Sequence, residues 1–210
     1  MFDASEEDKV QFALYLQALG EAIRSARKKK GEVLATFTIH IGLSQSYYSK
    51  IEQGQQNLTL GNLMVILEGL RLAPERFFQS FPPLRRKPRE YVVTRQRGLG
   101  SPEMPEGATY AQTFGLAVRH ERVRAGFTQD DFAFLSGLAR PYLSGLEGGK
   151  KNPTFIVIMR ILEVLELHPG DFFKHLRIRE GIHRARRVGP KGKNPEQVGP
   201  RNRARLRAHS

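Results

Sequence analysis

Basic side chains are the groups in this sequence with the clearest capacity for chemistry, because they can bind anions. The 210 residues hold 34 Lys and Arg against 21 Asp and Glu, which gives a net charge of +13. Lysines gather at 28–30 and 150–151, and residues 177–210 hold eleven basic and two acidic groups. A charge of this sign favours polyanions, with nucleic acid first and an anionic membrane surface second. A charge that serves only solubility is the alternative.

Other kinds of chemistry find little support in the residue types. The six histidines show no paired metal spacing and the chain has no cysteine, so we expect no metal site, no disulfide and no cofactor. Residues 98–103 begin like a dinucleotide-binding loop but lack its third glycine. The spacing suggests no Ser/His/Asp set. We therefore expect no catalytic residue and no enzyme.

The composition indicates a globular protein inside the cell. Apolar residues make up 40% of the chain, which is too much for a disordered protein. No apolar run approaches the roughly 18 residues that a membrane span needs. The acidic N-terminus also lacks the basic and apolar layout of a signal peptide. We expect a cytoplasmic protein without a membrane partner.

Shifts in composition divide the chain into five segments. The first is an acidic, amphipathic helix that either lengthens the next helix or offers a dimer or partner surface. A Pro- and Gly-rich linker joins two compact segments, and its Tyr91–Val93 stretch could form a strand or dock on a domain. A basic tail that cannot bury a core follows. The predicted segments are 1–18, 19–81, 82–109, 110–176 and 177–210.

The two compact segments are copies of each other. A shift of 95 places residues 15–81 on residues 110–176 without a gap, and 25 of the 67 positions are identical. Such agreement indicates duplication, and two units are too few for a solenoid. We therefore predict two small globular domains on a linker.

The second copy shows the clearer helix pattern, with five short helices and no strand. A capping box at Thr128–Asp131 should open the second helix, which Gly137 should close. The third helix should run from about Arg140 to Gly148. Thr154 should cap the fourth helix, and Pro169 suits the first turn of a fifth. The predicted fold class is all-α.

The stretch from Thr128 to Pro153, TQDDFAFLSGLARPYLSGLEGGKKNP, resembles the Cro/repressor-type helix-turn-helix domains, also called the xenobiotic-response-element family. The marks are TQ at the start of helix two, GL before helix three, YLSxLExG, and then NPT. The resemblance spans both copies. It implies lambda-repressor-like domains of five helices, with helix three in the major groove of double-stranded DNA. It also implies a bacterial or phage transcription regulator that associates with the nucleoid.

With that placement, the recognition helices would be residues 45–53 and 140–148. Arginine suits a bidentate contact with guanine and glutamine suits adenine, so the copies should contact different bases. Arg140 and Gln45 are the strongest candidates, whereas the tyrosines could equally pack or touch a phosphate. The candidates for base contact are Gln45, Ser46, Tyr47, Lys50, Arg140, Pro141, Tyr142 and Ser144.

Phosphate contacts follow from the same resemblance. Gln129 resembles the family's phosphate-binding glutamine, and residues just past helix three could clamp the DNA backbone. Copy one has Leu34 and Gln55–Gln56 at the corresponding positions, so it would use its own lysines or bind DNA weakly. The candidates for phosphate contact are Lys28, Lys29, Lys30, Gln129, Lys150, Lys151 and Asn152.

Two pairs of charged residues have a structural interpretation. Arg27 with Glu52, and Arg122 with Glu147, resemble the family's pair that joins helix one to the end of helix three. We expect both pairs to hold helix three in place.

The sequence leaves a second function open. In that alternative the chain is a protein-interaction regulator, such as an antitoxin or an activator that contacts RNA polymerase, and only copy two binds DNA. Candidate partners besides DNA are therefore RNA polymerase, a second regulator and a second copy of the chain.

Overall fold

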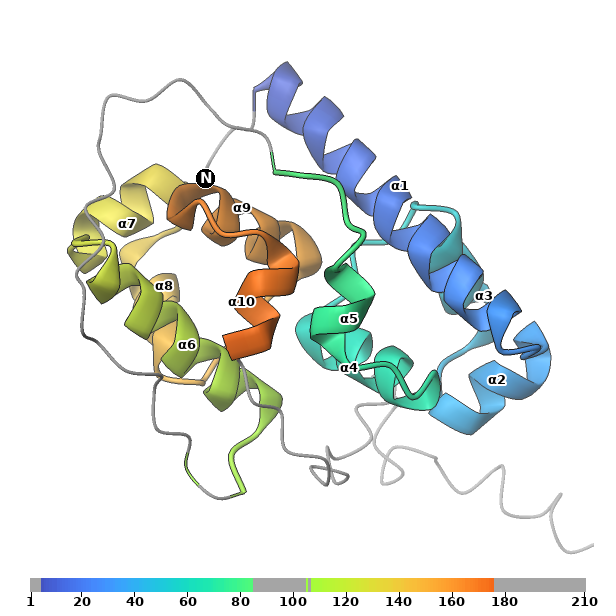
Figure 1. Ribbon diagram of the computed structural model, residues 1–210. Coiled ribbons are helices and arrows are strands. Elements are labelled where there is room, and N and C mark those ends of the chain that lie inside the picture. Colours follow the sequence, from blue (N-terminus) through green and yellow to red (C-terminus); the bar gives the residue numbers. More distant parts are fainter. Residues whose placement is uncertain (1–4, 85–104, 106, 176–210) are drawn as a thin grey trace, which may run out of the picture.

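The computed structural model describes residues 5–84, 105 and 107–175, and within them the chain is all-helical (Figure 1). Ten helices and one isolated β-bridge make up the regular structure of these described residues. The Tyr91–Val93 stretch, most of the predicted linker and the basic tail lie outside the described residues. No described helix is long and apolar enough to cross a membrane.

Each copy contributes five helices in the same order. The bounds in repeat one are α1 Glu6–Lys29, α2 Leu34–Ile41, α3 Gln45–Glu52, α4 Leu60–Gly69 and α5 Pro74–Phe78. Those in repeat two are α6 Tyr110–Arg124, α7 Gln129–Ser136, α8 Arg140–Glu147, α9 Phe155–Leu165 and α10 Pro169–His175. The predicted recognition helices are therefore α3 and α8, each one residue shorter than expected.

The helix ends in repeat two agree with the sequence in some places and differ in others. Gly137 ends α7 in the left-handed conformation with φ 59°, as glycine permits. The Thr128 hydroxyl accepts from the Asp131 N–H, as expected for a capping box. The same hydroxyl donates to the Asp131 carboxylate, so this carboxylate pairs with the Thr128 side chain instead of the Thr128 backbone N–H. Thr154 precedes α9 without a side-chain cap. The complete capping box is instead at Thr109 and Gln112, at the start of α6.

The predicted N-terminal helix is continuous with the first helix of repeat one. Its additional turns bring α1 against α9 of repeat two. The Tyr15 hydroxyl donates to Glu163 Oε1 at 2.7 Å, and Asp8 is also buried. Val10 and Leu14 stay exposed on the outer side of the helix. The early turns of α1 therefore join the two repeats.

The two repeats pack against each other, and their buried hydrophobic residues form one continuous cluster, a contact that the sequence did not predict. In Figure 1, α5 and α10 lie side by side between the two halves. The rings of Phe78 and Phe173 stack across this junction with centroids 5.0 Å apart, and Phe81 packs edge-on against Phe155. These aromatic residues pack within their own repeat and also across the junction, which joins the two repeats.

Candidate functional site

A close packing of helix one on helix three positions α3 and α8. Gly20 in α1 lies against the backbone carbonyl of Ile51, and Gly115 in α6 lies against that of Leu146. A Cβ at either glycine would clash with that carbonyl, so the approach requires glycine. Both repeats thus fix the third helix, α3 or α8, against a glycine of the first helix.

Buried ion pairs join the same two helices, and the structure brings the predicted partners together. In repeat one, Arg27 Nε lies 2.7 Å from Glu52 Oε1, and Nη2 donates to Oε2 at 2.9 Å. In repeat two, Arg122 makes the same bidentate pair with Glu147, at 2.6 and 3.1 Å. Each arginine also donates to a backbone carbonyl five residues further along the chain. This geometry fixes the end of the recognition helix to helix one.

Gln129 joins the ion pair of repeat two. Its Nε2 donates to Glu147 Oε2 at 2.8 Å, and its side chain is half-buried. The amide that was predicted to bind phosphate therefore also supports Glu147. Repeat one has Leu34 at this position and lacks this hydrogen bond.

The outer side of α8 carries the predicted base-contacting residues of repeat two. Arg140, Pro141 and Ser144 are exposed, and Pro141 suits the first turn of the helix. Arg140 does not lie alone, because its Nε is 2.7 Å from Asp130 Oδ1 on α7. Repeat one has Ala35 in place of Asp130.

The outer side of α3 is polar but different. Gln45, Ser46 and Lys50 are exposed, and Ser44 caps the helix by accepting from the Tyr47 N–H. Lys50 occupies the position of Gly145 in repeat two. The two helices therefore present different hydrogen-bonding groups from the same fold.

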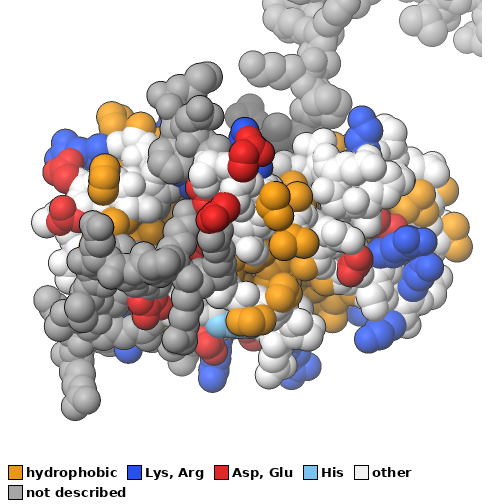
Figure 2. Space-filling model, turned by 90° about the horizontal axis from the view of Figure 1, so that it is seen from above, with side chains coloured by type: hydrophobic (Ala, Val, Ile, Leu, Met, Phe, Trp, Pro, Cys, Tyr) orange, Lys and Arg blue, Asp and Glu red, His pale blue; other side chains and the backbone are white. Residues whose placement is uncertain are grey.

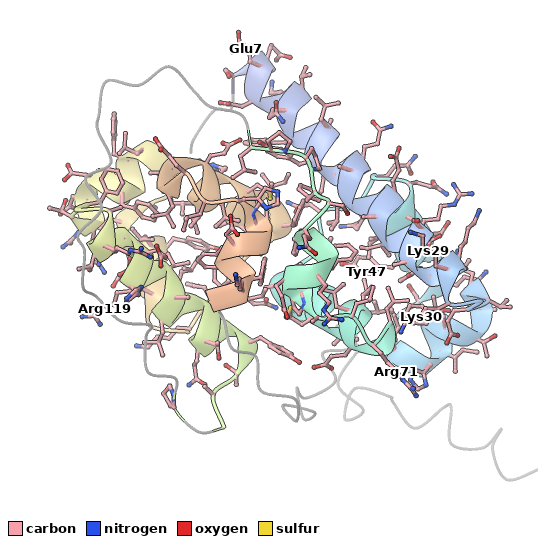
Figure 3. All side chains as sticks on the ribbon, in the orientation of Figure 1. Glu7, Lys29, Lys30, Tyr47, Arg71 and Arg119 are labelled. Carbon is pink, nitrogen blue, oxygen red and sulfur yellow. The ribbon has the colours of Figure 1, made fainter. Side chains whose placement is uncertain are left out.

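The two tyrosines of the recognition helices are half-buried rather than fully outward. The Tyr47 hydroxyl accepts from Asn62 Nδ2 of α4 at 3.0 Å (Figure 3). Burial raises the pKa of Tyr142, and Lys151 Nζ lies 6.0 Å from the centre of its ring. Neighbouring side chains therefore cover part of both tyrosines, and only the rest of each side chain is exposed to solvent.

The predicted phosphate-contacting lysines are all exposed. Lys28 and Lys29 end α1 and Lys30 follows it, while Lys150 and Lys151 follow α8. Figure 3 labels Lys29 and Lys30 in repeat one, and Figure 2 shows Lys and Arg side chains at several places on its face, with the largest group at one end. Repeat two therefore offers basic residues directly after α8, whereas those of repeat one lie at the end of α1, before α2 and α3.

Asn152 lies at the junction of the repeats, where its Oδ1 accepts from the Gly61 N–H at 3.0 Å. Its equivalent in repeat one, Asn57, accepts from the Ile156 N–H at 3.2 Å. The phosphate role predicted for Asn152 thus has to compete with a role in joining the repeats. Sequence reasoning missed this, although Asn57 and Asn152 are identical in both copies.

Metal chemistry has no visible basis in the described residues. Residues 5–84, 105 and 107–175 contain no group of three His, Cys, Asp or Glu side chains that could hold a metal ion.

The comparison with protein families decides what these helices are. A helix-turn-helix family model matches residues 40–77 and 118–172, one segment in each repeat. Both repeats are helix-turn-helix domains. The family is one of DNA-binding proteins rather than enzymes, and the match supports a DNA-binding transcription regulator as the general class. No curated protein and no solved structure matches the chain.

The helix-turn-helix match differs in extent between the repeats. In repeat two it begins within α6 and includes all of α7 and α8, whereas in repeat one it begins at the end of α2. Repeat one departs most at Leu34 and Gln55–Gln56, where repeat two has Gln129 and the two lysines. Repeat two is thus the more typical helix-turn-helix domain.

Proposed function

We propose that the protein is a sequence-specific regulator of transcription that places α3 and α8 in the major groove of double-stranded DNA. The exposure of Arg140 at the first residue of α8 carries this proposal. The far end of the same helix is fixed by the buried Arg122–Glu147 pair. A helix held rigidly at one end, with hydrogen-bonding side chains exposed at the other, suits the contact with base edges.

The charge supports the same function. Exposed lysines follow α8 in repeat two and end α1 in repeat one, so each repeat offers cations that can bind phosphates. Phosphate contacts fix the protein on the duplex without selecting a sequence, whereas contacts with base edges select it. Such a regulator would act in the cytoplasm, on the nucleoid.

The proposal is tested by selecting a preferred duplex from a random pool and measuring its affinity for two variants. Arg140→Ala should cost about 1–3 kcal/mol on that duplex and relax the preference at one position, which we expect to be a guanine. Lys151→Ala should weaken all duplexes about equally. If Arg140→Ala weakens every sequence by the same factor, Arg140 contacts a phosphate and does not select a base.

A second candidate function is a protein-interaction regulator in which only repeat two binds DNA. The observation that favours it is a difference between the repeats. Repeat one has Leu34, Gln55 and Gln56 where repeat two has Gln129 and two lysines. Arg140→Ala with Lys150→Ala should nearly abolish binding under both proposals. Gln45→Ala with Lys50→Ala should shorten the footprint only if repeat one contacts DNA, and an unchanged footprint would favour the second candidate.

A further inference from the structure

The junction of the two repeats is built from equivalent residues that exchange equivalent bonds. Thr59 forms an antiparallel bridge with Thr154, which is its own counterpart after the shift of 95. On either side, the Leu60 N–H donates to Pro153 and the Phe155 N–H donates to Leu58, both at 2.8 Å. Each of these bonds has an equivalent bond donated by the other repeat, and this requires a local two-fold rotation axis between the two threonines.

Two asparagines extend this symmetry into the helices. Asn57 of repeat one accepts from the second residue of α9, and Asn152 of repeat two accepts from the second residue of α4. The first N–H groups of a helix lack partners within the helix, and a side-chain oxygen satisfies them. Each repeat thus caps the fourth helix of the other, which explains how α9 begins after Thr154 without a cap from its own threonine.

The aromatic core and the first helix strengthen the same arrangement. Phe78 and Phe173 are counterparts, and their rings stack at an angle of 11° across the junction. Tyr15 of α1 also reaches Glu163 of α9. These contacts belong to the folded core, so the repeats are held as one unit and not as two domains on a tether.

The two-fold relation has a consequence for α3 and α8. Because they are equivalent elements, the axis that relates the repeats also relates these helices, and Figure 1 shows them on opposite sides of the α5–α10 centre. A protein two-fold axis matches an inverted arrangement of half-sites on DNA, as in dimers of single domains. Here the residues on the outer sides of the two helices differ. Helix α3 has Gln45, Ser46 and Lys50, and α8 has Arg140, Pro141 and Gly145 at the equivalent positions.

We infer that one chain binds one DNA site made of two unlike half-sites in inverted orientation, at a spacing fixed by the Thr59–Thr154 junction. The inference rests on the proposed function, because it assumes that both recognition helices contact DNA. A single chain takes the place of a homodimer, and a second copy of the chain is not needed to complete the site.

The first experiment measures orientation, spacing and stoichiometry on the selected duplex. We expect two dissimilar half-sites in inverted orientation and one chain per duplex, measured by native mass spectrometry. Insertion of either five or ten base pairs between the half-sites should lower the affinity about tenfold or more, because at least one bidentate base contact would be lost. Two independently tethered domains would instead recover affinity with the ten-base-pair insertion, because a full turn of DNA returns the two half-sites to their original relative orientation around the duplex.

The second experiment locks the junction. The two threonines form a pair without direct hydrogen bonds, for which the Cα atoms lie about 4.5 Å apart. This distance is within the range for a disulfide. The chain has no cysteine of its own, so Thr59→Cys with Thr154→Cys would form a defined bond on oxidation. The oxidised and reduced forms should bind the selected duplex equally, and each single cysteine variant is the matched control.

The outcomes separate the inference from the proposed function. Loss of binding on oxidation, with recovery on reduction, would show that the repeats must separate on DNA, and it would overturn the inference alone. Half-sites in direct orientation, or two chains on each duplex, would do the same. If the chain shows no preference among duplexes at all, both the proposed function and the inference are wrong.

Discussion

Arg140 and Asp130 form an ion pair across the turn of the second helix-turn-helix, with 2.7 Å between Nε and Oδ1. The side chains keep 63% and 70% of their surface exposed, so the pair lies at the surface and holds the arginine without burying it. Since Nε is engaged, the four N–H groups on the two Nη atoms remain to donate. Asp130 therefore orients the guanidinium group that we expect to contact guanine.

Removal of this carboxylate should change selectivity and affinity in opposite directions. In Asp130→Asn, Arg140 loses its fixed orientation, and preference for the selected base should fall about two- to fivefold, as for an exposed ion pair. Affinity for random duplexes should rise, because one negative charge near the phosphates is gone. Competition binding at one salt concentration measures both quantities.

Asp171→Asn is the matched control for this prediction. Asp171 is exposed in the first turn of α10, so the variant removes the same charge from another helix. It should leave the base preference unchanged. An unchanged preference in Asp130→Asn as well would mean that the ion pair does not orient Arg140 on DNA.

The lysines after α8 should account for part of the salt dependence of binding. Each lysine that contacts a phosphate releases counterions, so Lys150→Ala and Lys151→Ala should each reduce the slope of log affinity against log salt by about 1. Titrations between 50 and 200 mM salt would measure these slopes. Lys9→Ala is the control, because Lys9 pairs with Glu6 at the start of α1. A slope that is the same in all three variants would exclude these lysines from the phosphate contacts.

Local features of the fold were predictable from the sequence because they depend on residues close together or on repeated patterns. The duplication, the five helices of each repeat and the left-handed end at Gly137 follow from spacing and from glycine. The partners in the two Arg–Glu pairs came from the resemblance, since 25 residues separate them.

The joining of the repeats could not be predicted in the same way. An asparagine after helix three can bond within its own repeat, to DNA, or to the other repeat, and the sequence does not distinguish these partners. Phe78 and Phe173 likewise fit an ordinary core pattern in each repeat, although their rings meet across the junction. The identity of both residues in the two copies was the available signal, because a two-fold axis needs equivalent residues on each side.

A buried hydroxyl in repeat one is a site where a smaller side chain should improve stability. Tyr48 is fully buried and its ring packs against Phe37, and its hydroxyl lies beside the Arg27–Glu52 pair without a well-formed hydrogen bond among the described residues. A buried polar group without a partner costs free energy, so Tyr48→Phe should raise the free energy of unfolding by about 1 kcal/mol. Urea denaturation followed by circular dichroism measures it. A loss of stability would instead show that the hydroxyl makes a bond in solution.

The same residue should make the protein sensitive to alkali. Burial, together with the negative charge of Glu52, raises the pKa of Tyr48 above its ordinary value. The unfolded chain would ionise this tyrosine above about pH 10 while the folded chain keeps it neutral, so stability falls as the pH rises through that range. Tyr48→Phe should lose less stability than the unchanged protein between neutral and strongly alkaline pH. Equal losses would assign the alkaline effect to other groups.

The buried ion pairs should reveal whether the two repeats unfold together. Glu147→Leu leaves Arg122 buried without its carboxylate and should cost about 3–5 kcal/mol, whereas the double variant with Arg122→Met should lose much less. Glu52→Leu makes the matched change in repeat one. Because the repeats share one core, either variant should shift a single transition of the whole chain in urea. Separate transitions, with each variant moving only the one that belongs to its own repeat, would show that the halves unfold independently and that the junction is too weak to fix the spacing of α3 and α8.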